Sequence, residues 1–156
     1  MSKRASNRFR KGLIALRLLP VYVLISLFKH LVPLRWLARW AWCTPVGQRD
    51  RTAERGLSAS VLRLSQLTGL PDRDCLQRSL LLYRVLSRAG AAPVLIIGFG
   101  RLNGAVRGHA WVVVDNQPVL KEPELLQFSP AFGFGAVGFM FQANESRFKQ
   151  SNEIAD

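Results

Sequence analysis

The sequence predicts an α+β fold in which helices come first and a small antiparallel sheet follows. Apolar residues recur at helical spacing as far as Ala89. From Pro93 onward, short apolar runs alternate with turn residues instead, as in strands. The chain has 156 residues, 49% of them apolar, which is enough for one domain with a hydrophobic core.

The composition is strongly basic, with 22 Lys and Arg residues against 10 Asp and Glu and a net charge of +12. This balance favours an acidic partner such as nucleic acid, an anionic membrane surface or an acidic peptide, or it keeps an apolar protein in solution. The chain has only two cysteines, Cys43 and Cys75, and two histidines, His30 and His109. Their number and spacing argue against a structural zinc site and favour a reducing compartment. We therefore expect a cytoplasmic protein with no metal and no cofactor, although a need for a nucleotide stays open.

The first 42 residues divide into a basic tail and an apolar arm. Residues 1–11 carry five basic side chains and no acid, which predicts a disordered tail. Residues 12–42 are apolar with interspersed basic residues, and prolines interrupt them, so we expect two short helices at about 12–30 and 33–42. The uninterrupted apolar runs are too short for a transmembrane helix.

Two tryptophans in this arm, Trp36 and Trp40, lie beside Arg35 and Arg39 at helical spacing. Tryptophan next to arginine suits a membrane interface, where indole rings lie at the level of the headgroups. It equally suits a helix packed on the domain with its basic ends in water. We favour packing, and a peripheral membrane contact stays open.

Residues 43–56 are polar and contain a turn signal, so we expect a linker, with Cys43 as a small apolar filler. Leu57–Leu70 then has the pattern of an amphipathic helix, which Ser58 or Ser60 could cap. The main folded core is predicted to run over 57–142.

Cys75–Ala89 is the clearest helix in the sequence. Asp72 or Asp74 offers a capping carboxylate, and Gly90 is placed to end the helix. Cys75 then lies in the first turn, where the helix dipole stabilises an anion and so favours the thiolate.

The remaining segments predict an antiparallel meander. The expected elements are a strand over 93–99, a polar loop over 100–108, a strand over 109–114, a turn at Asp115-Asn116 and a third strand. This turn pairs Val114 with Gln117 and places His109 opposite Glu122. Residues 128–141, rich in Phe and Gly, are expected to cover the sheet, and the polar residues 143–156 to fray.

Cys75 with His109 is the one cysteine–histidine pairing in which both residues have a favourable context. A thiol nucleophile at a helix start and a base on a later strand are the parts that thiol acyl transfer needs. The alternative is that Cys75 is an ordinary core residue, which is the commoner role of a helical cysteine.

Three stretches shift this balance: Asp74-Cys75-Leu76-Gln77-Arg78-Ser79-Leu80, Gly90-Ala91-Ala92-Pro93, and Gly108-His109-Ala110-Trp111 with the eight residues after it. With their order and separation, they resemble the lasso-peptide B proteins, leader peptidases with a transglutaminase-like (papain-like) core. The resemblance covers about a third of the chain.

The resemblance implies a Cys-His-Asp triad in which Cys75 is the nucleophile and His109 the general base and acid. The family's aspartate falls at Lys121 here, so the acid departs from the pattern. Glu122 is adjacent and is our candidate for the orienting acid, with Asp115 as the alternative. The Cys75 N–H is the default oxyanion donor, and Gln77 and Arg78 could serve or could lie on the helix surface.

As a member of this family the chain would be a stand-alone peptidase acting on a ribosomally made precursor peptide. The implied partners are a separate leader-recognition protein and an asparagine-synthetase-like lasso cyclase, which needs the freed α-amine. Two other functions stay open: another transglutaminase-like acyl transferase, and a basic adaptor for membranes or nucleic acid, of which the motifs above do not favour nucleic acid.

Overall fold

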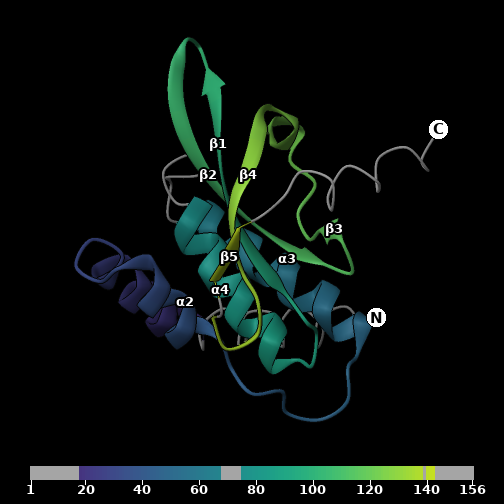
Figure 1. Ribbon diagram of the computed structural model, residues 1–156. Helices are drawn as coiled ribbons and strands as arrows, with labels where there is room; N and C mark the ends of the chain where they lie inside the picture. The colour runs from purple at the N-terminus through teal and green to yellow at the C-terminus, as the bar shows by residue number, and fades with distance from the viewer. Residues whose placement is uncertain (1–17, 68–74, 139, 143–156) are drawn as a thin grey trace, which may run out of the picture.

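A computed structural model describes residues 18–67, 75–138 and 140–142 (Figure 1). The helix α4 (Cys75–Arg88) lies between an antiparallel sheet and the helices α2 (Leu34–Ala41) and α3 (Arg51–Leu67). The predicted tails at 1–11 and 143–156, and the predicted helix caps Asp72 and Asp74, lie outside the described residues.

The central helix α4 supplies much of the core. Leu80, Leu81, Leu82 and Tyr83 are all buried, because one side of the helix faces the sheet and the other faces α2 and α3. Full burial of four such side chains is a large hydrophobic contribution, about 1.5–3 kcal/mol for each apolar one. A helix over these residues is confirmed: it runs from Cys75, the first described residue after the gap at 68–74, to Arg88, one residue short of the predicted end.

The apolar arm forms two helices, as predicted. Residues 18–28 are helical, a turn follows, and α2 comes next. Tyr22 and Ile25 from the first helix, and Leu37 and Ala41 from α2, join the core. Over the described part of the chain, no helix combines the length and the apolar character needed to cross a bilayer.

The linker expected at 43–56 is shorter than predicted, because α3 already begins at Arg51. The Asp50 carboxylate accepts a hydrogen bond of 2.8 Å from the Thr52 N–H, which is the bond of a helix N-cap. The predicted caps are wrong: Ser58 and Ser60 lie inside the helix, and each hydroxyl bonds the carbonyl four residues back.

Five strands form one antiparallel sheet in the order β3-β2-β1-β4-β5. They are β1 (Val94–Leu102), β2 (Ala105–Val114), β3 (Gln117–Pro118), β4 (Phe128–Phe134) and β5 (Met140–Gln142). The polar loop expected at 100–108 is instead the tip of the β1–β2 hairpin, which turns at Asn103-Gly104 and extends beyond the helices (Figure 1). Asn103 and Gly104 both have positive φ, as a two-residue hairpin turn requires.

The predicted register of the next hairpin is confirmed, since Val114 pairs with Gln117 and Val113 with Pro118. After β3 the chain crosses to the other side of β1, passing through the 3-10 helix η1 (Pro123–Gln127). Residues 128–141 therefore do not cover the sheet but extend it as β4 and β5, with the short 3-10 helix η2 (Ala136–Gly138) between them. The sheet is antiparallel throughout, but it is not a simple meander.

The absence of a side chain at Gly100 lets η1 lie close to the sheet. A Cβ added to Gly100 on β1 would lie 2.1 Å from the Gln127 carbonyl oxygen. Only glycine fits here, so the backbone of η1 can approach β1. The close approach is made by the C-terminal end of η1, the 3-10 helix that Glu122 precedes.

Candidate active site

Cys75 opens α4, and that end of the helix is fastened to β2. The Ser79 hydroxyl, one turn along, donates a 2.8 Å hydrogen bond to the Ala110 carbonyl and is itself buried. Cys75 is half-buried and free of any disulfide. Its thiol lies against the His109 side chain and the Ala110 N–H. A helix start and a neighbouring strand thus present one thiol to one imidazole.

His109 lies on β2, paired with Gly98 of β1. Its ring stacks on Phe128, with 4.8 Å between centroids, so the imidazole has little freedom to rotate. Its Nε2 lies 3.0 Å from Oε2 of Glu122. With Nε2 held by the carboxylate, Nδ1 is the ring nitrogen left for Cys75.

Glu122 comes directly before η1, and its two carboxylate oxygens have different partners. Oε2 meets His109, and Oε1 accepts a 2.6 Å hydrogen bond from Nη2 of Arg78. Arg78 is buried and lies on α4, one turn beyond Cys75. The four side chains therefore form a series of contacts, Cys75 to His109 to Glu122 to Arg78, that starts and ends on α4. We call this series the ring, because the helix backbone closes it.

The charges of this ring support one another. Burial raises the pKa of the Cys75 thiol, but the hydrogen bond and charge of His109 and the Ala110 N–H outweigh it, so the pKa is lowered. Cys75 and then Glu122 raise the pKa of His109 to about 9. Burial opposes ionisation of Glu122 too, yet His109 and Arg78 hold the pKa of that carboxyl below its usual range. The arrangement favours a thiolate beside an imidazolium.

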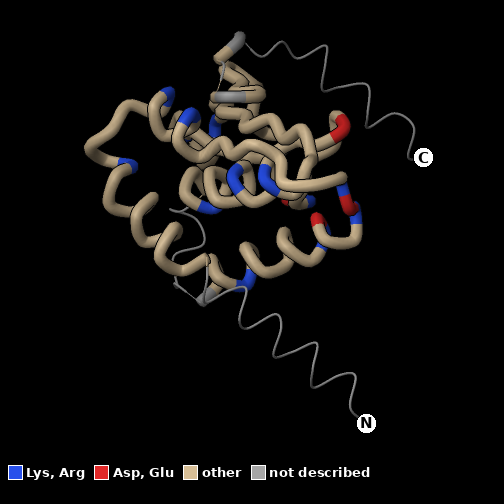
Figure 2. Tube along the Cα trace, turned by 90° about the horizontal axis from the view of Figure 1, so that it is seen from below, with Lys and Arg blue, Asp and Glu red and all other residues tan. Residues whose placement is uncertain are grey.

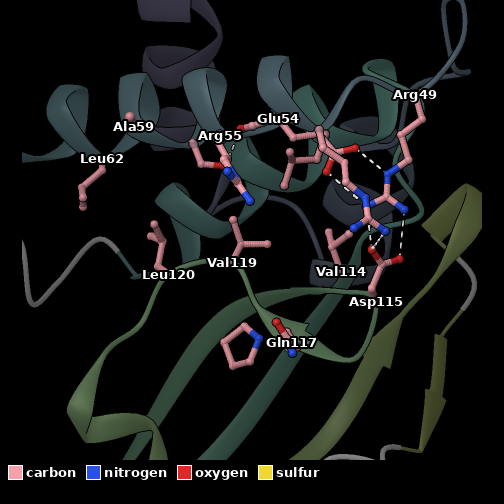
Figure 3. Close-up of a pocket in the computed structure, with 14 residues that line it drawn as sticks. Arg49, Glu54, Arg55, Ala59, Leu62, Val114, Asp115, Gln117, Val119 and Leu120 are labelled. Carbon is pink, nitrogen blue, oxygen red and sulfur yellow. Dashed lines mark hydrogen bonds and ion pairs between the residues drawn. The ribbon is translucent and has the colours of Figure 1, made fainter. Parts of the chain in front are cut away.

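The alternative acid, Asp115, is occupied elsewhere. It lies in the β2–β3 turn, where Arg49 binds both of its oxygens, at 3.0 and 2.8 Å. Figure 3 shows Asp115 beside Arg49, and both line a pocket of about 450 Å³ between α3 and the chain over 114–120. Arg49 holds the pKa of Asp115 below its usual value. Asp115 thus belongs to a surface ion pair and not to the ring around His109.

Of the other candidates, Gln77 and Arg78 do not lie on the helix surface. The Gln77 side chain is buried, and its Nε2 donates a 2.8 Å hydrogen bond to the Tyr22 carbonyl. Cys43 is half-buried, and its N–H donates a hydrogen bond of 3.1 Å to the Ser87 hydroxyl. His30 is exposed in the turn after the first helix. The catalytic roles of Cys75, His109 and Glu122 stay a prediction, but the structure does bring these three together.

Arg78 is the residue whose place the sequence did not reveal. A basic residue in a helix usually points into water, and its contact with Glu122 joins positions 44 residues apart. One signal was present: Arg78 lies three residues after Cys75, so it shares the face of α4 that carries the thiol.

Comparison with known proteins agrees with this architecture. A family model described as "Transglutaminase-like superfamily" matches residues 15–133, which include Cys75, His109 and Glu122. Searches of curated proteins and of solved structures each find no match. The matched span covers most of the chain, and with the helix-borne cysteine facing a strand-borne histidine it shows that this chain belongs to the transglutaminase-like superfamily.

Proposed function

We propose that this protein is a cysteine peptidase that removes the leader from a lasso-peptide precursor. The observation that carries the proposal is the ring of Cys75, His109, Glu122 and Arg78, in which thiol and imidazole are both biased towards their charged forms. The family allows peptidases and acyl transferases alike. The three sequence stretches described above favour the lasso-peptide leader as the substrate.

The chemistry follows from the positions of the side chains. The Cys75 thiolate adds to the carbonyl carbon of the scissile peptide bond. The C–N bond breaks as the His109 imidazolium gives its proton to the leaving amine, and a thioester remains on Cys75. Water then attacks the thioester, His109 takes a proton from it, and Cys75 leaves as a thiolate. Glu122 orients the imidazole throughout, and Arg78 orients Glu122.

The partners proposed for this reaction are a separate leader-recognition protein, which delivers the precursor, and a lasso cyclase, which uses the exposed α-amine. No cofactor takes part in the steps above. The setting proposed is the cytoplasm, where the thiol stays reduced.

The test is cleavage of a candidate precursor, followed by mass spectrometry, in the presence of the recognition protein. We expect cleavage at one bond by the wild type and at least about a 1,000-fold loss for Cys75→Ala and for His109→Ala. Cys43→Ala is the matched control, because it removes the other thiol away from the site, and it should cleave normally. Cleavage that survives Cys75→Ala would refute the thiol mechanism.

Acyl transfer is the second candidate, because the superfamily match is equally compatible with it. The thioester is common to both reactions, and the acceptor decides between them. Adding a primary amine to the assay distinguishes the two: a product carrying the amine's mass at the new carboxyl end identifies a transferase, whereas a free acid identifies a peptidase.

A further inference from the structure

The positive charge of the protein is concentrated in its N-terminal part. The first 49 residues contain ten Lys and Arg side chains and no Asp or Glu, and all ten acidic residues come from Asp50 onward. In Figure 2 the described part of this segment, residues 18–49 with the helix over 18–28 and α2, carries blue but no red, and the red residues lie on the other side of the molecule. Such a segment attracts anionic surfaces.

The same segment exposes large apolar side chains. The helix over 18–28 is apolar nearly all round, yet only one side packs inward, through Tyr22 and Ile25. On the other side and in the turn after it, Leu27 is 60% exposed and Leu31 is 79% exposed. Also exposed on this helix and on α2 are Leu19, Val23, Leu24, Phe28, Trp36 and Trp40. An exposed apolar patch of this kind marks a surface that binds another protein or a membrane.

The helix α2 adds the residue types of a lipid interface. It packs on the domain through Leu37, Ala38 and Ala41, as the sequence favoured, and its tryptophans point outward. The Arg35 guanidinium lies 5.9 Å from the centre of the Trp36 ring. Indole and guanidinium groups side by side suit the level of lipid headgroups, where apolar rings and phosphates are both within reach.

We propose that the arm, defined as residues 18–42, docks the protein on an anionic lipid membrane, lying in the plane of its surface. Exposed leucines would enter the boundary between headgroups and acyl chains, and basic residues would meet the phosphates. A protein partner would normally offer acids against the arginines and leave fewer apolar side chains scattered over two helices and a turn. The combination of apolar surface with charge of one sign favours lipid.

Docking would place the candidate active site near the membrane. The inner side of the arm contacts the start of α4, where Gln77 donates to the Tyr22 carbonyl and accepts a 3.3 Å hydrogen bond from Lys29 Nζ. Gln77 lies two residues beyond Cys75. The membrane proposal rests on exposure and charge alone, so it holds or fails whether or not the protein is a peptidase.

The experiment is co-sedimentation of the full chain with vesicles of phosphatidylcholine alone or with about a third phosphatidylglycerol. A basic residue near an anionic surface strengthens binding about fivefold, so we expect at least about tenfold tighter binding to the anionic vesicles, and weaker binding in high salt. Arg35→Gln/Arg39→Gln should weaken binding about tenfold or more. The matched control is Arg101→Gln/Arg107→Gln, which removes the same charge from the exposed β1–β2 hairpin and should bind normally.

The apolar part is tested with Leu27→Gln/Leu31→Gln, which changes exposed side chains and so preserves the fold. Binding should again fall about tenfold or more. Leu126→Gln, at a site 81% exposed on η1, is its control. Three results would each overturn the proposal: no binding to anionic vesicles, equal loss in arm and control variants, or a dimer in solution that Leu27→Gln/Leu31→Gln dissociates.

Discussion

The ion pair between Arg78 and Glu122 offers a quantitative test of the ring. The pair is 2.6 Å long, and only 10% and 24% of the two side chains are exposed. With charges about 4 Å apart and an effective dielectric constant of about 20, the attraction is about 4 kcal/mol. Desolvation of both groups opposes it, so we expect a net coupling free energy of about 2 kcal/mol.

The perturbation is a double-mutant cycle with Arg78→Met, Glu122→Gln and the two together. Glu122→Gln leaves a buried guanidinium without its counter-charge, so it should lower the free energy of unfolding by about 3 kcal/mol. Arg78→Met leaves Glu122 its contact with His109 and should cost about 2 kcal/mol. The double variant should lose about 3 kcal/mol, clearly less than the two single losses together.

Urea unfolding at about pH 7 measures all four proteins, with linear extrapolation to water. The folded-state pKa of Glu122 is lowered, so its stabilising charge is present above pH 4.5 and is lost as the pH falls through the lowered value. The coupling should therefore shrink in acid. Losses that add within about 0.5 kcal/mol at neutral pH would refute the reasoning.

Four further predictions concern the thiol, the imidazole and two glycines. Alkylation of Cys75 should reach half its maximal rate below pH 9.0, the usual thiol pKa, and His109→Ala should move that midpoint upward. The pKa of His109 is raised from 6.5 to about 9, so its charged contacts stabilise the fold fully below pH 6.5, and this stabilisation should be lost as the pH rises through about 9. Peptidase activity should fall over the same pH range, because the imidazolium loses its proton. Gly100→Ala should lower the free energy of unfolding by about 2 kcal/mol or more, because its Cβ would meet the Gln127 carbonyl, a strain visible in urea unfolding. Gly56→Ala, with open space around it inside α3, should instead raise that free energy by about 0.5–1 kcal/mol.

Local signals predicted much of the fold and of the candidate site. Helical spacing and the change to turn-separated apolar runs were enough for α4, and the two-residue turn at Asp115-Asn116 gave the pairing of Val114 with Gln117. The expected strand pairing of His109 with Glu122 does not form, because β3 ends at Pro118. Glu122 reaches His109 from the chain just before η1 instead. Two local signals in the sequence, at Asn103-Gly104 and at Asp50, indicate structure that the predictions above do not contain. Asn103-Gly104 is a strong hairpin turn, but the strands beside it are exposed and lack an apolar pattern. Asp50 caps α3 in a stretch whose polar composition suggested a linker.

The rest depends on contacts between distant segments. The strands β4 and β5 are not predicted by local pattern. A register shift where β4 pairs with Ile97 and Gly98 breaks the alternation expected of a strand, and β5 is only three residues long. The role of Arg78 requires knowing that a helix and the chain after β3 meet, and no local pattern encodes that meeting.

The ring of side chains has a mechanical consequence, because α4 contributes both its first and its last member. Cys75 and Arg78 move with the helix, whereas His109 and Glu122 move with the sheet and the chain after it. A slide of the helix along the sheet would change the thiol–imidazole contact and the guanidinium–carboxylate contact at once. The Ser79 bond to Ala110 is the brace against such a slide. Inactivation on warming should accordingly begin when α4 loosens from the sheet, at a lower temperature than the loss of helix content.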